Sequence, residues 1–334
     1  EVLRNPTFPE VELEKFKARV SAYLATLARA PTQAANSLYS RAIYGPENPM
    51  GGVWTPELSA GISMEKLLAF HEQEIAPDNM TIYMIGNLDL VTAKAAVESA
   101  FGRWRAKSES ARAPVGRALE RRARVILIDH PGSASSAILA GHAVEPYDAE
   151  TATEIFVMNR IIGGGFESRL NMNLREDKGW SYGYRSNVSS NTSGDQYFAT
   201  SGQVQTDKTA ESMREILKEL TAFGRAAPAR AREVNRVKLN RSRSLPGSFA
   251  TNRGFLSSII ASESYGLPYD YAKRAAERVA AVTLDGVNQR AGSMIDTENL
   301  TWLVIGDLSI VEDDVRALGY GEVEVWDAFG NVLR

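Results

Sequence analysis

Arg175 and Tyr182 are the residues of this chain whose types and spacing best suit chemistry. They stand seven positions apart in the stretch GGGFESRLNMNLREDKGWSYGYRS, which runs from Gly163 to Ser186. A guanidinium is a permanent cation with several donors, and a phenol can donate one more hydrogen bond. Together the two groups could hold one carbonyl or carboxylate. The pair is a binding device without an obvious catalyst.

Two predicted helices precede this pair. An apolar stripe over Asp148 to Ile162 predicts a helix, and the glycine-rich turn Gly163, Gly164 and Gly165 ends it. A second, short helix is expected from Glu167 to about Glu176. Its leucines stand one turn apart and face the core, which directs Arg175 to one side.

A strand that begins at Ser181 would complete the arrangement. Lys178-Gly179 ends the short helix, and the strand could bring the Tyr182 hydroxyl close to the Arg175 guanidinium. A structural alternative exists for each residue. An arginine near a helix C-terminus often only complements the helix dipole, and a tyrosine at the start of a strand often packs in the core. The spacing alone does not separate the two interpretations.

Composition excludes several classes of function. The 334 residues predict about two domains, and 44% hydrophobic residues can fill ordinary cores. The net charge of −3, with Lys and Arg spread along the chain, gives no footprint for nucleic acid and no polybasic membrane anchor. The apolar runs have the length of strands and fall short of the roughly 20 residues of a membrane span. The absence of cysteine excludes disulfides and thiolate metal sites.

The three histidines give no metal site. His71 lies in HEQEI, where Ile75 takes the place of the second histidine of an H-x-x-E-H motif. One histidine with a carboxylate falls short of a zinc site, so we interpret His71 as a decoy at a helix end. His130 lies in a turn and His142 closes a probable strand, each without a second ligand nearby. We therefore predict no metal ligand in this chain.

The chain repeats itself at long range. Asn79 to Leu88 matches Asn299 to Leu308 at an offset of 220 residues, and each copy is predicted to be a strand that ends in glycine. The helices before the two strands keep this offset, and Tyr44-Gly45 matches Tyr265-Gly266. A period this long indicates two related domains rather than a solenoid.

The two copies are unequal. Residues 1–104 match only the C-terminal half of the unit at 124–334, with an Arg-, Ala- and Ser-rich linker at 105–123. If the two domains are equal in size, about 110 further residues are expected before Glu1. The complete unit would carry Arg175 and Tyr182.

The predicted order of elements in the second unit indicates an α+β fold. Strands come first, helices cluster afterwards, and the helices are expected to cover one face of a mostly antiparallel sheet. The predicted strands are Arg124 to Ile128, Ser136 to His142, the hairpin Ser181 to Ser190 with Asp195 to Gln205, and Leu300 to Gly306. The later helices are Thr209 to Phe223, Ala229 to Arg243, Thr251 to Tyr265, Tyr269 to Val282 and Leu284 to Ile295.

These motifs carry a family resemblance. A glycine-rich turn followed by LRE-x-x-G-x-x-Y resembles the second-domain signature of the insulinase/pitrilysin-like zinc metallopeptidases, which include the mitochondrial processing peptidase. Asn5 to Glu10 resembles the first domain after its zinc helix, and Val204 to Asp207 and Leu245 to Phe249 resemble bacterial members. The resemblance implies the LuxS/MPP-like metallohydrolase fold in two homologous domains. It also implies that Arg175 and Tyr182 bind the substrate backbone beside zinc held by another domain. The sequence leaves open whether the compartment is the bacterial periplasm or cytoplasm.

The chain differs from active members of the family at the positions that bind zinc. The resemblance places H-x-x-E-H before the region where this chain begins and a third ligand, a glutamate, at about Tyr23, where the chain reads Ala22-Tyr23. It therefore implies that the chain is a zinc-lacking half. This half would work as a dimer with a zinc-bearing peptidase subunit or with an upstream half. The substrate would be an extended peptide, which could pair with the sheet edge. Three alternatives remain: a structural assembly subunit, a peptide-binding module, and a truncated active protease with its metal motif upstream of Glu1.

Overall fold

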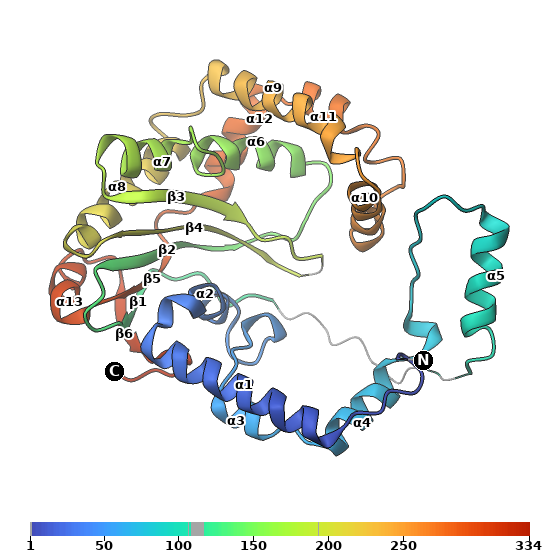
Figure 1. Ribbon diagram of the computed structural model, residues 1–334. Coiled ribbons are helices and arrows are strands. Elements are labelled where there is room, and N and C mark those ends of the chain that lie inside the picture. The colour runs from blue at the N-terminus through green and yellow to red at the C-terminus, as the bar shows by residue number, and fades with distance from the viewer. Residues whose placement is uncertain (1, 106, 108–116, 193) are drawn as a thin grey trace. The chain divides into compact units, whose positions relative to one another are not determined.

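A computed structural model describes residues 2–105, 107, 117–192 and 194–334, and the chain divides into two compact units (Figure 1). Unit 1 comprises Glu1–Ala25, Trp54–Pro114 and Pro246–Ala272. Unit 2 comprises Thr26–Val53, Val115–Leu245 and Lys273–Arg334.

Unit 2 is built on one six-stranded mixed sheet with the order β3-β4-β2-β5-β1-β6. β3, β4, β2 and β5 pair antiparallel, whereas β1 pairs parallel with both β5 and β6. The mostly antiparallel α+β fold is therefore confirmed, with β6 and the parallel pairing as additions. The strands are β1 (Arg124–Asp129), β2 (Ser135–Val144), β3 (Ser181–Val188), β4 (Gln196–Gln205), β5 (Thr301–Gly306) and β6 (Glu322–Trp326).

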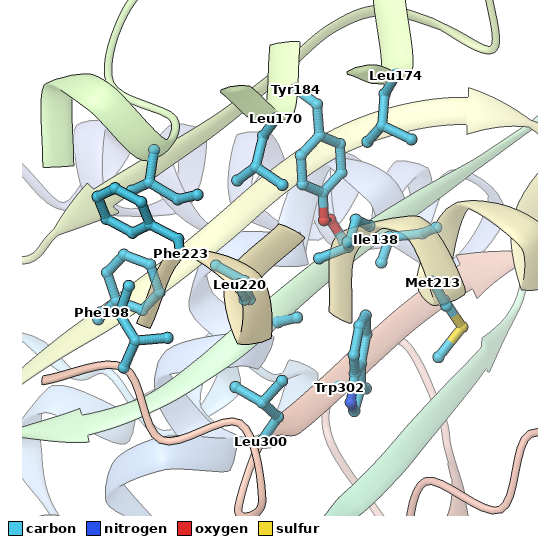
Figure 2. Packing of buried hydrophobic residues seen from close by; sticks show 14 of the residues in the cluster. Ile138, Leu170, Leu174, Tyr184, Phe198, Met213, Leu220, Phe223, Leu300 and Trp302 are labelled. Carbon is cyan, nitrogen blue, oxygen red and sulfur yellow. The ribbon is translucent and has the colours of Figure 1, made fainter. Parts of the chain in front are cut away.

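Helices of unit 2 enclose a large apolar core against the sheet. Fully buried side chains from strands and helices meet there, among them Tyr184, Phe198, Phe223 and Trp302 (Figure 2). Burial of each such side chain contributes about 1.5–3 kcal/mol. The helices of unit 2 are α2 (Ala35–Tyr44), α6 (Ala152–Ile162), α7 (Arg169–Asn171), α8 (Thr209–Gly224), α11 (Ala275–Ala281), α12 (Leu284–Met294) and α13 (Leu308–Arg316), with short helical turns η1 (Pro31–Ala34), η2 (Pro49–Gly51), η4 (Met172–Asp177) and η5 (Thr206–Lys208).

Helices cover both faces of the sheet rather than one. α2 comes from the N-terminal third of the chain and packs on the opposite face from α6, α8 and α12, where the Tyr39 hydroxyl donates to the Thr301 carbonyl at 3.2 Å (Figure 1). The central strands are buried on both sides and therefore lack the alternation of a half-exposed strand. This second cover explains why β1 and β5 read as continuous apolar runs.

Unit 1 is helical in the part of it that the structure describes. Its helices are α3 (Pro56–Ala60), α4 (Met64–Glu74), η3 (Pro77–Asn79), α5 (Leu90–Phe101) and α10 (Asn252–Ser264), while α1 (Glu10–Arg29) and α9 (Ala231–Ser248) have residues in both units. Each described helix of the chain is too short or too polar to span a membrane.

Local signals recur between the two copies of the predicted repeat. Ser63 caps α4 by accepting from the Lys66 amide at 3.2 Å, and Thr283 caps α12 by accepting from the Gly286 amide at 3.0 Å. Gly45 and Gly266 both have left-handed backbones, with φ of 83° and 63°. Corresponding positions of the two copies thus have the same local role.

The two predicted repeat strands have different outcomes. Thr301–Gly306 is β5, wholly buried between β2 and β1. The matching segment at 81–86 forms no strand in the described structure, so this prediction is wrong for the first copy. A strand needs a paired neighbour, and the described residues supply none here. Ile82 and Met84 consequently remain 43% and 48% exposed.

Boundaries elsewhere agree with the predictions to within a few residues, with two exceptions. The helix expected over Tyr269 to Val282 is helical only at Ala275–Ala281, and α13 and β6 were not predicted. Of the predicted linker, residues 106 and 108–116 lie outside the described residues. Residues 117–123 are neither helix nor strand, and the Leu119 amide bonds to the Ile43 carbonyl at 2.9 Å. The domain boundaries at 104 and 124 stay a prediction. They come from the sequence repeat, whereas the two compact units are defined by contacts in space.

Candidate functional site

The glycine-rich turn after α6 permits a close approach between a helix and the edge strand. A Cβ added at Gly163 would lie 2.4 Å from the Ser186 hydroxyl oxygen and 2.5 Å from the Ser186 amide nitrogen. α6 ends at Ile162 as predicted, but Gly163 has a φ of −154°, which any residue adopts. The glycine is therefore required by packing against β3 and not by a left-handed helix cap.

Arg175 lies in a widened helical turn. α7 continues into the π-helical segment Met172–Asp177, where the Lys178 amide bonds to the Asn173 carbonyl at 3.0 Å. Gly179 ends this segment with a φ of 67°, as the sequence predicted. Leu170 and Leu174 are fully buried, so they fix the face from which Arg175 projects.

The Arg175 guanidinium is held by two neighbours. Its central carbon lies 4.7 Å from the centroid of the Phe166 ring, and its Nε lies 3.3 Å from a carboxylate oxygen of Glu176. Its side chain keeps 38% of its surface exposed. The aromatic contact restricts a flexible cation while leaving donors free for a ligand.

Tyr182 projects into solvent. It is 99% exposed, and in the part of the chain that the structure describes no hydrogen bond joins its hydroxyl to Arg175. The ladder between β3 and β4 is irregular between Ser181 and Tyr184, so Tyr182 lies at a bulge. Arg175 and Tyr182 thus lie on two elements that contact each other, η4 and β3, but no hydrogen bond joins their side chains among the described residues.

The edge of β3 is partly occupied. The Asn171 side-chain oxygen accepts from the Tyr184 amide at 3.2 Å, and the Asn159 side chain donates to the Ser186 carbonyl at 3.3 Å. These backbone groups are not available to another strand. Pairing of an extended peptide with this edge, which the sequence suggested, is restricted to other positions.

Sequence reasoning missed the two asparagines and a group of arginines around the turn. Asn171 is fully buried next to Leu170 in the sequence, and a polar residue among apolar core positions is the signal that could have identified it. Burial first, and then the charges of Arg175 and Arg160, lower the pKa of Arg185. Three guanidinium groups therefore share one electropositive neighbourhood.

His71 and His142 make structural contacts. His71 Nε2 lies 2.7 Å from the Leu3 carbonyl oxygen, and its ring packs edge-on against Phe8. His142 is buried, with Nδ1 2.9 Å from the Ala143 carbonyl oxygen and Nε2 accepting from the Asp296 amide at 3.0 Å. Burial lowers the pKa of His142, which is therefore neutral near pH 7.

Among the described residues, no group of three His, Cys, Asp or Glu side chains could hold a metal ion. Tyr23, at the position where the resemblance places a glutamate ligand, lies on α1 and is 47% exposed. A phenol at this position cannot replace a carboxylate ligand of zinc.

Comparison with known proteins identifies relatives of the chain. Residues 61–240 match the family profile "Peptidase M16 inactive domain". An uncharacterised zinc protease of Bacillus subtilis strain 168, YmxG, is 27% identical over 225 residues, which cover 66% of this chain and 53% of that protein. The chain thus spans about half the length of this curated relative.

Solved structures show the same fold. A peptidase M16 inactive domain from Pseudomonas fluorescens has a TM-score of 0.81 at 22% identity, over 92% of this chain and 73% of that one. The Escherichia coli periplasmic protease PqqL has a TM-score of 0.72 at 14% identity, over 88% of this chain and 32% of that one. A chain of complex III2 from Candida albicans has a TM-score of 0.71 at 15% identity, over 90% and 74%.

Proposed function

Because the chain belongs to the peptidase M16 family and matches that family's inactive domain, we propose that it is the zinc-lacking half of a zinc metallopeptidase. In this proposal it binds the substrate peptide through Arg175 and Tyr182. A partner, either a separate subunit or another part of the same polypeptide, supplies the zinc.

The exposure of Tyr182 is the observation that carries the proposal. A tyrosine that is 99% exposed contributes nothing to the core, and its hydroxyl bonds to nothing in the described residues. Arg175, on the helical segment before β3, rests on the Phe166 ring and keeps 38% of its side-chain surface exposed. Two donors kept accessible at a turn that is otherwise closely packed suit a ligand better than they suit a scaffold.

The chemistry that follows is a division of labour. Zinc bound in the partner would supply a Lewis acid and an activated water. In this chain, Arg175 would donate hydrogen bonds to a peptide carbonyl or to the oxyanion that develops from it, and Tyr182 would donate one more. Donors held in place before the reaction stabilise developing charge and align the extended peptide.

A structural assembly role is the second candidate, and the similarity to a chain of complex III2 favours it. In that case Arg175 and Tyr182 would have no ligand. A truncated active protease is a third candidate, in which the metal motif lies elsewhere in a longer polypeptide.

Reconstitution separates these candidates. The purified chain is mixed with a zinc-bearing M16 protein from the same cells, and hydrolysis of an extended fluorogenic peptide is measured together with zinc content. We expect hydrolysis only in the mixture and zinc only in the partner. Stoichiometric zinc and hydrolysis in the chain alone would overturn the proposal. So would a stable complex that neither binds nor cleaves any peptide, which is the outcome for a scaffold.

A further inference from the structure

Unit 2 contains a polar groove beside the proposed peptide site. It has a volume of about 560 Å³ and is lined by the C-terminal part of α6, the glycine-rich turn and α9. Three arginines and two aromatic rings line it, together with a single carboxylate: Arg160, Arg236, Arg241, Phe156, Phe166 and Glu167.

The groove has an excess of positive charge. Arg236 is paired with Glu167, with 3.0 Å between the nitrogen and the carboxylate oxygen. Arg160 donates to the Gly164 carbonyl, and Arg241 lies 5.2 Å from the centroid of the Phe156 ring. Neither of these two arginines has a carboxylate partner among the described residues. Two uncompensated guanidinium groups therefore face the same groove.

Phe166 joins this groove to the proposed peptide site. One side of its ring carries the Arg175 guanidinium at 4.7 Å, and the residue also lines the groove. It is 53% exposed, which leaves apolar surface between the two places. A peptide whose backbone is held by Arg175 would therefore place a neighbouring group at the groove.

We propose that this groove binds a carboxylate of the substrate peptide and so makes the chain selective for acidic peptides. The inference rests on the proposed function, because the ligand is the same peptide. Guanidinium groups bind carboxylates through paired hydrogen bonds, and such bonds are stronger than bonds between neutral groups. The carboxylate can belong to an Asp or Glu side chain or to the C-terminus of the peptide.

Binding of labelled peptides to the full chain tests the inference. Fluorescence anisotropy compares an amidated extended peptide that carries one central Glu with the same peptide carrying Gln. A third peptide has Gln and a free C-terminal carboxylate. We expect a carboxylate-bearing peptide to bind about tenfold more tightly than the amidated Gln peptide, a preference that weakens with salt. The arm that shows the preference identifies the source of the carboxylate.

Two variants assign the preference to the groove. In Arg160→Gln/Arg241→Gln, the preference for a carboxylate-bearing peptide should fall to about onefold, while binding of the amidated Gln peptide is unchanged. Arg241→Gln alone should reduce this preference. Arg316→Gln is the matched control, because Arg316 pairs with Glu312 on α13 outside the groove. Circular dichroism and thermal melting confirm that each variant is folded.

The outcomes distinguish this inference from the proposed function. Equal binding of all three peptides by the wild-type chain would overturn the inference and leave the proposed function standing. A preference that survives in both groove variants would also overturn it. Failure of the chain to bind any of the peptides would contradict the proposed function, and the groove assignment would fall with it.

Discussion

Tyr182 and Tyr184 lie two positions apart on β3 and have opposite environments. Tyr182 is 99% exposed, whereas Tyr184 is fully buried, with its hydroxyl 3.2 Å from both the Ile138 carbonyl oxygen and the Thr200 hydroxyl oxygen. Burial raises the pKa of Tyr184 well above its ordinary value. Tyr184 therefore contributes to the core, whereas Tyr182 leaves its hydroxyl open for the ligand that we propose.

Replacing each tyrosine by Phe should give opposite results. Tyr182→Phe should change the free energy of unfolding by less than about 0.5 kcal/mol, since it alters only the surface. It should weaken peptide binding severalfold, because one donor is lost. Tyr184→Phe should lose about 1 kcal/mol of stability. Urea denaturation and peptide binding of both variants provide the check, and a destabilised Tyr182→Phe variant with normal binding would argue that Tyr182 is structural.

His142 should make stability depend on pH. Its pKa is lowered in the folded state by burial, so the unfolded chain binds the additional proton first as the pH falls. The stabilisation is complete above the ordinary histidine pKa of about 6.5 and is lost as the pH decreases below it. Urea denaturation between pH 7.5 and 5 measures this slope. His142→Gln should flatten the slope in this window, and an unchanged slope would assign the effect to other groups.

At the scale of elements, α6, the glycine-rich turn and β3 form one closely packed set. The Asn159 side-chain nitrogen donates to the Ser186 carbonyl, and the Asn159 side-chain oxygen accepts from the Ser186 hydroxyl. A methyl group at Gly163 would have no room against Ser186. This packing positions the segment that carries Arg175 next to the bulge that exposes Tyr182.

Gly163→Ala should separate these elements. The added methyl group would lie 2.4 Å from the Ser186 hydroxyl oxygen, and overpacking of this kind costs about 1–3 kcal/mol. We expect a lower melting temperature by differential scanning calorimetry. Gly247→Ala is the matched control, because nothing beyond its chain neighbours and the backbone of its own helix lies within 4 Å of the added carbon. Equal melting temperatures for the two variants would show that the turn tolerates a side chain.

The segment at 81–85 should differ in hydrogen exchange from its repeat copy. Residues 81–85 have no backbone hydrogen bonds among the described residues, whereas the matching residues of β5 pair with strands on both sides. Hydrogen-exchange mass spectrometry of the chain should find rapid exchange at 81–85 and strong protection in β5. Comparable protection of the two segments would mean that 81–85 is paired in solution.

Local signals predicted most elements but not their partners. The caps at Ser63 and Thr283 and the glycine after Arg175 have local causes, so the sequence was sufficient to place them. The same strand pattern produced β5 in one copy and an unpaired segment in the other, because pairing depends on distant residues. For the site, the resemblance indicated Arg175 and Tyr182. The groove arginines come from α6 and α9: Arg236 and Arg241 follow Arg160 by 76 and 81 positions, and no local pattern joins them.

At the scale of the whole molecule, the chain is one half of an enzyme in the function that we propose. The chain has the fold of the peptidase M16 inactive domain and covers 53% of the length of its Bacillus subtilis relative. A zinc-lacking half can influence catalysis only through the substrate that it positions, so changes in its site should alter turnover without altering metal content.

Turnover of the assembled enzyme with Arg175→Ala tests this claim most directly. We expect kcat/KM to fall at least about tenfold, because a charged donor to the substrate is lost, while the zinc content of the assembly is unchanged. Size-exclusion chromatography confirms that the variant still assembles with its partner. Unaltered kinetics at normal zinc content would contradict the role assigned to Arg175, and a loss of zinc would place this residue at the metal instead.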